Sequence, residues 1–366
     1  MLRVLQCVNN MHRAGLETML MNYYRNVDRS RIQFDFLTHR PFRSDYDDEI
    51  ESLGGKIYYA PRLIPQNYPS YFSYMKSFFT EHPEYVIVHS HIDAMSYLPL
   101  LAAKKANIPV RIAHSHNTAI DLDYKYPIKQ FFRSNICKVA TDYLACGKDA
   151  GRFLFNESCV NVIPNAIVAD KFLYNDEIRA MMKKELSLDG RFVIGHVGRF
   201  SRQKNHCFLI DIFCEILKIN PYSVLLLVGT GENEKKIRSR VDRLGISDRV
   251  QFLGVRSDVD KLYQVMDVFV LPSLFEGIPV VGIEAQFSDL SCFFSSRVPK
   301  EVAFSKKCTF IRDDLPAKDW AEQIMKKSGV QRGKEEYITS KYRIENAAPQ
   351  FEQYYFNLLR ARGLDV

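Results

Sequence analysis

The chain has 366 residues, of which 46% are hydrophobic and 25% charged, and its formal net charge at pH 7 is +7. Two domains are expected from this length, and the composition excludes a disordered or fibrous protein. No apolar run reaches the roughly 18 residues of a membrane-spanning helix, which argues against an integral membrane protein. The mild positive charge suits an anionic ligand or an anionic membrane surface, but it is too dispersed to indicate nucleic-acid binding.

The start of the chain and its cysteines favour a cytoplasmic protein. The first residues, MLRVLQCVNN, lack the layout of a signal peptide. The eight cysteines include no CxxC pair and no disulfide-framework spacing. We therefore expect reduced cysteines in the core of a cytosolic protein.

The first half of the chain alternates apolar runs with amphipathic stretches. Strands are expected at residues 2–8, 32–38, 56–60, 85–90, 110–113 and 143–146, and helices at residues 16–24, 68–80 and 95–106. This alternation predicts a parallel, doubly wound sheet. The acidic stretch at residues 44–52 is expected to be exposed. The loop that contains Gly15 has no GxGxxG pattern, which counts against an NAD-dependent enzyme.

Two His-x-His pairs lie at the ends of two of these strands, His89 with His91 and His114 with His116. Residues two apart on a strand share one face of the sheet, so four imidazoles have the spacing to gather at one sheet edge. A zinc site is one interpretation, and structural histidines with satisfied hydrogen bonds are the other. No further class of ligand clusters with the four histidines, so no metal site is expected.

A stretch from residue 121 to residue 143 interleaves basic and aromatic side chains. Its basic residues are Lys125, Lys129, Arg133 and Lys138, and its aromatic residues include Tyr124, Tyr126, Phe131 and Phe132. This pattern is typical of an interfacial membrane-binding helix. A core-packed helix with a charged outer face has the same pattern, and both interpretations stay open. Three Asp-x-Asp strings, which begin at Asp45, Asp121 and Asp258, follow no convincing strand and are interpreted as chance.

The second half begins with an apolar run at residues 192–197, which predicts a strand, and a basic loop follows it. The loop contains Gly198, Arg199 and Lys204. Arginine supplies a fixed fork for phosphate oxygens and lysine a flexible point charge, so together they suit one diphosphate. A helix is expected at residues 206–219, and a strand at residues 223–228 ends in Gly229, where a turn permits a ligand to approach the backbone.

An apolar run at residues 268–271 and the string that follows it organise this half of the chain. The run predicts a buried strand, Gly277 and Pro279 predict a turn, and a helix is expected from about Val280. Glu276 would then lie in the loop and Glu284 on the second turn of the helix. The N–H groups at the start of such a helix bind anions, and ligands of open α/β sheets bind at this kind of corner.

The string FEGIPVVGIEAQ resembles the E-x7-E signature of retaining glycosyltransferases with the GT-B fold, and more narrowly of family 4, which contains capsule and exopolysaccharide sugar transferases. The resemblance implies an α/β protein with two Rossmann-like, doubly wound parallel-sheet domains that face a central cleft. Residues 1–168 would form the acceptor-binding domain, with a closing helix at residues 344–366 packed back on it. Residues 169–343 would form the nucleotide-sugar-binding domain.

The same resemblance implies roles for individual residues. Arg199 and Lys204 would hold the donor diphosphate, and Glu284 would bind the ribose hydroxyls. The implied catalytic residues are Glu276 and His114, which would face the donor sugar, with Arg199 and Lys204. The implied donor-binding residues are Gly15, Arg199, Lys204, Gly229, Gly254, Val255, Glu276, Gly277, Ile278, Pro279, Val280 and Glu284. The acceptor-side candidates are His89, His91, His116 and Asn117.

The implied reaction is a metal-independent sugar transfer, with retained anomeric configuration, from a nucleotide-diphosphate donor to an acceptor hydroxyl. A UDP-sugar donor and a lipid-linked saccharide acceptor of bacterial capsule or exopolysaccharide assembly are expected, with peripheral contact to the inner face of an anionic cell membrane. No cofactor and no nucleic acid are expected. Ala14, Ala166 and Asp289 stand where similar sequences carry glycine. These departures leave a catalytically degenerate partner subunit open, and a sugar-nucleotide epimerase is another alternative.

Overall fold

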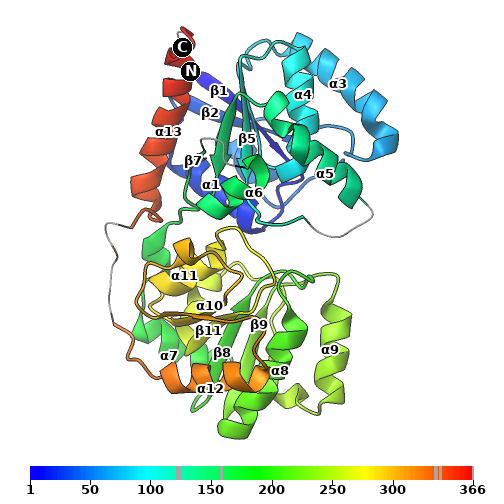
Figure 1. Cartoon of the computed structure of the whole chain (residues 1–366). Helices are drawn as coiled ribbons and strands as arrows, with labels where there is room; N and C mark the ends of the chain where they lie inside the picture. The colour runs from blue at the N-terminus through cyan, green and yellow to red at the C-terminus, as the bar shows by residue number, and fades with distance from the viewer. Residues whose placement is uncertain (121–124, 157–159, 334–336, 338–339, 365–366) are drawn as a thin grey trace. The chain divides into compact units, whose positions relative to one another are not determined.

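The computed structural model describes residues 1–120, 125–156, 160–333, 337 and 340–364. The chain divides into two compact units, one formed by Met1–Ala166 with Lys341–Val366 and the other by Ile167–Ser340. Each unit has its own parallel sheet (Figure 1). Each unit also has its own cluster of buried apolar side chains. Within the described ranges, none of the helices combines the length and the apolar character that crossing a bilayer requires.

The first unit is built on a seven-stranded parallel sheet with the strand order β3-β2-β1-β4-β5-β6-β7. Its strands are β1 (Leu2–Val8), β2 (Ile32–Thr38), β3 (Ile57–Tyr59), β4 (Ile87–Ser90), β5 (Val110–Ser115), β6 (Asp142–Ala145) and β7 (Asn161–Val162). All residues of β2 are buried, and all but one of β1. Near-continuous apolar strands of this kind are expected where helices cover both faces of a parallel sheet.

The helices of the first unit include the last helix of the chain. They are α1 (Gly15–Asn26), α2 (Asp47–Ser52), α3 (Tyr68–Glu81), α4 (Tyr97–Lys105), α5 (Tyr126–Asn135), α6 (Lys148–Phe155) and α13 (Ile344–Arg360). In α13, the buried residues Ala347, Phe351, Tyr355 and Leu359 recur every fourth position and form one apolar stripe. Helix α13 packs beside α1, as the red and blue helices of Figure 1 show.

The second unit is built on a six-stranded parallel sheet with the order β10-β9-β8-β11-β12-β13. Its strands are β8 (Phe192–Val197), β9 (Ser223–Val228), β10 (Val250–Phe252), β11 (Val268–Leu271), β12 (Ser291–Ser295) and β13 (Cys308–Ile311). Its helices are α7 (Asp176–Glu185), α8 (His206–Ile219), α9 (Glu234–Arg243), α10 (Val259–Val265), α11 (Val280–Phe287) and α12 (Ala317–Lys327).

Both sheets reverse their strand order at one point. In the first unit β1 lies between β2 and β4, and in the second unit β8 lies between β9 and β11. At this point the connections that follow two neighbouring strands, β1 and β4 or β8 and β11, run to opposite faces of the sheet. This divergence opens a crevice at the carboxyl ends of the two strands. The predicted site residues follow these strands, so the topology places them at the ligand-binding edge of each sheet.

Several local expectations are corrected by the structure. Strand β13, helix α6 and the short helix α2 were not among the expected elements. The stretch at residues 44–52 is not fully exposed, because Asp47 is buried and accepts hydrogen bonds from the backbone of Ser44 and the hydroxyl of Tyr59. The described cysteines are free, but the expected core position holds only for Cys7, Cys146 and Cys292. Cys137 is exposed, and Cys207, Cys214 and Cys308 are only half-buried.

Candidate functional site

The loop between β8 and α8 is shaped by backbone packing against the next loop of the sheet. The amide of Gly198 donates to Val228, and the amide of Phe200 donates to Thr230. Gly229 has a φ of +127°, and a Cβ on it would lie 2.2 Å from the carbonyl oxygen of Gly198. Gly229 was predicted as a ligand-binding position, and the structure gives it a further role, because only glycine permits this close approach of two backbones.

Lys204 and Glu276 are brought together at the carboxyl ends of β8 and β11. The Nζ atom of Lys204 lies 2.6 Å from Oε1 of Glu276, and their side chains are only 15% and 7% exposed. Gln203 reinforces the pair by donating to Oε2 of Glu276 at 3.3 Å and to the carbonyl of Phe275 at 3.0 Å. The loop that carries the predicted phosphate-binding residue Lys204 and the loop that carries the predicted sugar-binding residue Glu276 are therefore in direct contact.

Arg199 lies in the same loop but has a very different environment. Its side chain is 74% exposed, and its guanidinium lies 3.0 Å from a carboxylate oxygen of Glu232 in the loop after β9. An exposed ion pair of this kind contributes at most about 1 kcal/mol, so Arg199 is easily released to another anion. Glu232 was not predicted as a site residue.

Helix α11 begins where the sequence predicts it, at Val280, and Pro279 is its N-cap. No side chain caps this helix start, and its first turn contains no acidic residue. The preceding residues Gly277 and Ile278 are buried. An uncapped helix start that follows the loop carrying Glu276, the partner of Lys204, suits an anionic ligand, because helix N-termini attract negative charge.

Glu284 lies on the second turn of α11, and its carboxylate accepts a hydrogen bond of 2.8 Å from the hydroxyl of Tyr263. Burial raises the pKa of Glu284 to about 7, and the Tyr263 hydrogen bond partly opposes this shift. Tyr263 comes from α10 and is fully buried. Tyr263 was not among the predicted site residues, although a buried tyrosine usually needs a hydrogen-bond partner for its hydroxyl.

The loop after β10 completes this edge of the second sheet. The carbonyl of Gly254 accepts from the amide of Gly229 at 2.8 Å, and Gly254 has a φ of +65°. Val255, the next residue, is 64% exposed. The loops after β8, β9 and β10 are thus joined in series by backbone contacts. The predicted donor-binding residues from Arg199 to Glu284 all lie in these loops or in the β11–α11 corner.

In the first unit, the four predicted histidines form one cluster at the carboxyl ends of β4 and β5, in which His89, His91 and His114 are buried and His116 is half-buried. Nε2 of His89 lies 3.1 Å from Nδ1 of His114, and Nδ1 of His91 lies 3.1 Å from Nε2 of His116. Burial lowers the pKa of each imidazole, to about 3 for His116 and well below the usual range for the other three. All four side chains are therefore neutral at pH 7.

The surroundings of the cluster include three side chains that sequence analysis did not single out. Gln6 on β1 accepts from Nε2 of His91 at 2.8 Å, and Tyr355 on α13 lies 2.7 Å from Nδ1 of His89. Asp93 accepts from the backbone of His116 and from the side chain of Asn117. Asn117 is thereby fixed beside the cluster.

Three of the histidines have a spacing that also suits a metal ion. His89, His91 and His114 each offer a ring nitrogen, and these three atoms lie within 4.8 Å of one another. Imidazole is the common protein ligand of zinc and similar ions. Each of the three histidines also makes at least one hydrogen bond to a protein side chain through a ring nitrogen, so the geometry alone does not require a metal.

Two positions that depart from the resembled pattern have local explanations. Ala14 has extended backbone dihedral angles (φ −141°, ψ 177°), which do not require glycine, and it precedes Gly15, the first residue of α1. Asp289 has a φ of +54°, where glycine is favoured. The side chain of Asp289 compensates by binding Lys307 at 2.8 Å and the backbone of Gly333.

The described part of the basic, aromatic stretch contains helix α5, a short 3-10 turn at Ile136–Lys138 and the start of β6. Phe132 is buried and stacks on Tyr97, and Arg133 donates to the carbonyl of Phe153 at 2.6 Å. These contacts agree with a core-packed helix that has a charged outer face. Phe131 is 58% exposed, and the membrane interpretation stays a prediction. Tyr124 and the string that begins at Asp121 lie outside the described residues.

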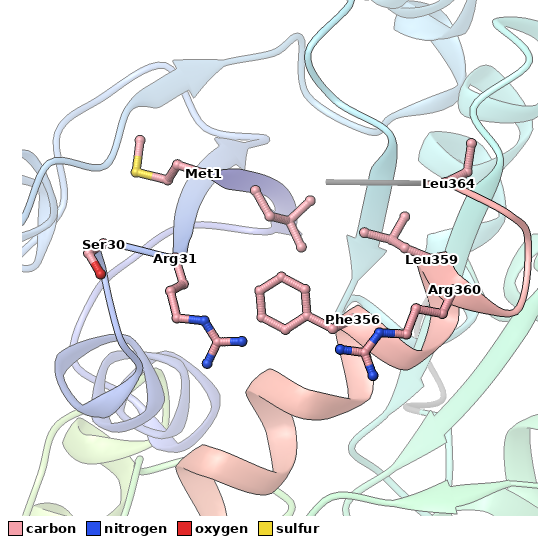
Figure 2. Close-up of a pocket in the computed structure, with 8 residues that line it drawn as sticks. Met1, Ser30, Arg31, Phe356, Leu359, Arg360 and Leu364 are labelled. Atoms are coloured by element: carbon pink, nitrogen blue, oxygen red, sulfur yellow. The ribbon is translucent and has the colours of Figure 1, made fainter.

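A separate pocket of about 390 Å³ lies between the start of β1 and the end of α13. Its lining residues, shown in Figure 2, are Met1, Leu2, Ser30, Arg31, Phe356, Leu359, Arg360 and Leu364. Leu2 is at the amino end of β1, whereas ligands of parallel sheets bind at the carboxyl ends. The pocket contains no predicted site residue.

Comparisons with known proteins agree with the geometry of the second unit. Residues 191–326 match a family model described as glycosyl transferases group 1. The chain is 36% identical over 346 residues to EpsF of Bacillus subtilis (strain 168), which its name places among the glycosyltransferases. That alignment covers 92% of this chain and 90% of EpsF.

Two further relatives carry more specific names. The capsular polysaccharide biosynthesis glycosyltransferase CapH of Staphylococcus aureus is 29% identical, with coverage of 89% of this chain and 90% of CapH. The Escherichia coli UDP-Gal:alpha-D-GlcNAc-diphosphoundecaprenol alpha-1,3-galactosyltransferase is 30% identical over 58% of each chain. Among solved structures, Anabaena HepE in complex with UDP-glucose superposes with a TM-score of 0.81 at 16% identity, covering 98% of this chain and 100% of HepE.

Proposed function

Because the chain belongs to the group 1 glycosyltransferases of the GT4 type and has the GT-B fold, we propose that it moves a sugar from a UDP-sugar to a lipid-linked saccharide in capsule or exopolysaccharide assembly. The observation that carries this proposal is the Lys204–Glu276 pair at the carboxyl ends of β8 and β11. A cation for phosphate and a carboxylate for sugar hydroxyls meet there, and the loop that carries the carboxylate leads into an uncapped helix.

The choice of donor and acceptor rests on the relatives. HepE was crystallised with UDP-glucose, and the E. coli relative is named for a UDP-galactose donor and a diphosphoundecaprenol-linked acceptor. CapH is named for capsular polysaccharide biosynthesis. A UDP-sugar and a lipid-diphosphate-linked saccharide are the substrates that these three names support together.

In the proposed reaction, the bond between the anomeric carbon and the diphosphate oxygen breaks, and a bond to the acceptor oxygen forms on the same face of the sugar. Lys204 and Arg199 would stabilise the negative charge that develops on the diphosphate, together with the amides at the start of α11. The departing phosphate would accept the proton of the acceptor hydroxyl, so no side chain is assigned as a general base. Two cations at the diphosphate make a metal ion unnecessary in this scheme.

Donor binding requires a change of partners at the site. Lys204 would exchange the carboxylate of Glu276 for diphosphate oxygens, and Glu276 would then accept hydrogen bonds from the sugar hydroxyls. Arg199 would leave Glu232, with which it forms only an exposed ion pair. The ionised carboxylate of Glu284 would accept hydrogen bonds from both ribose hydroxyls.

Calorimetric titration with UDP, GDP and ADP tests the donor site directly. Wild-type protein should bind UDP more tightly than GDP or ADP, and Lys204→Ala should lose most of this affinity. Lys218→Ala is a matched control, because Lys218 is an exposed lysine that pairs with Glu215 on α8. Failure of the wild-type protein to bind any of the three nucleotides would contradict the proposal and favour a partner subunit without donor binding.

A further inference from the structure

A tyrosine from the last helix of the chain is built into the histidine cluster. Tyr355 on α13 is fully buried, and its hydroxyl oxygen lies 2.7 Å from Nδ1 of His89. The same oxygen accepts a hydrogen bond of 3.2 Å from the side-chain amide of Gln6. Helix α13 thus reaches the carboxyl end of the sheet through one hydroxyl group.

Gln6 sets the direction of these hydrogen bonds, because the two ends of its amide are chemically different. The Nε2 group of Gln6 is only a donor, so the Tyr355 oxygen accepts from it. Among the described residues, the only other partner of that hydroxyl is Nδ1 of His89, so Nδ1 is the acceptor that remains for the Tyr355 proton. The Oε1 atom of Gln6 is only an acceptor, so Nε2 of His91 carries a proton.

The direction of each hydrogen bond fixes the direction of the next one along the cluster, because a neutral imidazole has one donor and one acceptor nitrogen. His89 accepts at Nδ1, so its Nε2–H donates to Nδ1 of His114 at 3.1 Å. His91 donates at Nε2, so its Nδ1 accepts from Nε2–H of His116 at 3.1 Å. All four imidazoles therefore carry their proton on Nε2.

The chain of hydrogen bonds ends on His114. Its Nδ1 is occupied by His89, so its proton is on Nε2, and this buried atom has no hydrogen-bond partner among the described residues. A buried N–H group without a partner is costly, and such groups in native proteins usually serve a bound ligand or water. His114 also lies at the carboxyl end of β5, which is the ligand-binding edge of the sheet.

We propose that Tyr355 and Gln6 are positioning residues that fix the tautomer of His114, so that His114 presents an N–H donor to an oxygen atom of the substrate and is not a general base. This inference rests on the proposed function for the kind of substrate, which is a sugar hydroxyl or a phosphate oxygen. The tautomer itself follows from the hydrogen bonds of the first unit alone.

A metal ion held by His89, His91 and His114 is the competing interpretation of the same cluster. It would need a lone pair on a ring nitrogen of each histidine at the shared centre. In the hydrogen-bonded arrangement, the proton on Nε2 of His89 lies between His89 and His114, so that nitrogen has no lone pair for a metal ion. Nδ1 of His89 is then the acceptor for the Tyr355 hydroxyl. The ordered hydrogen bonds explain the contacts of Gln6 and Tyr355 with the cluster, which a metal ion does not explain. The histidine tautomers distinguish the hydrogen-bonded cluster from a metal site.

The tautomers are measurable by long-range ¹H–¹⁵N spectroscopy of the histidine side chains in the full-length protein, with signals assigned through single histidine substitutions. In the wild type, His114 should show a protonated Nε2 and a bare Nδ1. In Gln6→Glu, the carboxylate accepts the Tyr355 proton, so the chain should reverse and the His114 proton should move to Nδ1. In Tyr355→Phe, nothing selects the direction, and His114 should show both tautomers.

Tyr354→Phe is the matched control, because Tyr354 is the neighbouring residue on α13 and its hydroxyl does not touch the cluster. It should leave the His114 signals unchanged. Reversal in Gln6→Glu should also lower kcat for the sugar donor by roughly tenfold, which is the order expected for one lost hydrogen bond, with donor KM changing less. A bare Nε2 on wild-type His114, or an unchanged tautomer in Gln6→Glu, would overturn the proposal.

Further outcomes separate the proposed tautomer of His114 from a metal site and from a failure of the proposed function. Ring-nitrogen signals typical of metal ligation that disappear on addition of EDTA would overturn the proposal in favour of a metal site. Unchanged kcat in a Gln6→Glu protein whose His114 tautomer has reversed would also overturn it. A wild-type protein that shows the predicted tautomers but binds no nucleotide would instead contradict the proposed function, so the two failures are distinguishable.

Discussion

The ammonium group of Lys204 lies 2.6 Å from the carboxylate of Glu276, so the two side chains proposed to bind diphosphate and sugar bind each other. Both are largely buried, and each satisfies the charge of the other. A donor must therefore supply a phosphate for Lys204 and hydroxyl groups for Glu276 at the same time. Free sugar or free phosphate replaces only one side of the pair, which favours the complete nucleotide sugar as ligand.

Removing the cation of this pair should weaken donor use. Lys204→Ala should lower kcat/KM for the sugar donor by about 10- to 100-fold, because a hydrogen bond to a charged group contributes about 1.5–3 kcal/mol. Steady-state kinetics with the same donor measures the loss. The control Lys218→Ala should be within twofold of wild type, and an equal loss in both variants would show that the effect is not local.

Replacing Arg199 should weaken donor binding more than it lowers the stability of the fold. Arg199→Ala removes an exposed ion pair with Glu232, so it should change the free energy of unfolding by less than about 1 kcal/mol. It should still weaken nucleotide-diphosphate binding severalfold in calorimetry. Glu232→Gln should leave that affinity equal or higher, since it releases Arg199, and a lower affinity in Glu232→Gln would contradict this account.

Donor affinity should rise with pH through the ionisation of Glu284. Its pKa is raised to about 7 by burial, so the carboxylate that accepts ribose hydroxyls is mostly protonated at about pH 6 and mostly ionised at about pH 8. Calorimetry with UDP over this range should show a rise that is reduced in Glu284→Gln, whose side chain does not titrate. Parallel pH profiles in the two proteins would assign the dependence to another group.

The same carboxyl group should also make the fold less stable as pH rises. A raised pKa means that the folded state holds the proton more tightly than the unfolded state, so the contribution to stability is present below the ordinary pKa of 4.5 and is lost as pH rises through about 7. Tyr263→Phe removes a hydrogen bond that lowers this pKa. The midpoint of the UDP-binding profile should therefore move to higher pH in that variant, and a midpoint at lower pH would contradict the assignment.

Gly229 should tolerate no side chain, for reasons that do not involve the ligand. In Gly229→Ala, the new Cβ would overlap the carbonyl of Gly198 at a residue with φ of +127°. Gly245→Ala is the control, because Gly245 also has a positive φ (+67°) but has nothing within 4 Å of the new Cβ. Thermal unfolding should show a loss of about 1 kcal/mol for the control and a clearly larger loss for Gly229→Ala.

The sequence allows most of the fold to be predicted, because the chain follows simple patterns. Buried strands such as β8 and β11 are continuous apolar runs, and α8 carries its apolar residues at helical spacing. Helix α6 and strand β13 were not predicted from the sequence. Strand β13 is a run of only four residues that are mostly half-buried, and α6 has eight residues with no capping side chain. Short elements of this kind are fixed by their neighbours rather than by their own sequence.

The candidate site was predictable where one short motif carries it, and not where distant segments complete it. Glu276 and Glu284 lie within one string of the sequence, and Lys204 follows a predicted strand. Tyr355 and Gln6 are separated by 349 positions, and no pattern in the sequence links them. Tyr263 likewise resembles any core aromatic until its hydroxyl is seen to bind Glu284.

The measurement that tests the central claim most directly is the release of UDP from UDP-sugars by wild-type protein and by Lys204→Ala. The assay uses UDP-glucose and UDP-galactose, with and without a diphosphoundecaprenol-linked saccharide. The account predicts slow release by the wild type alone, faster release with the lipid-linked acceptor, and little of either with Lys204→Ala. A wild-type protein that binds UDP but releases none from any sugar donor, with or without the acceptor, would contradict the claim that this chain is a sugar transferase.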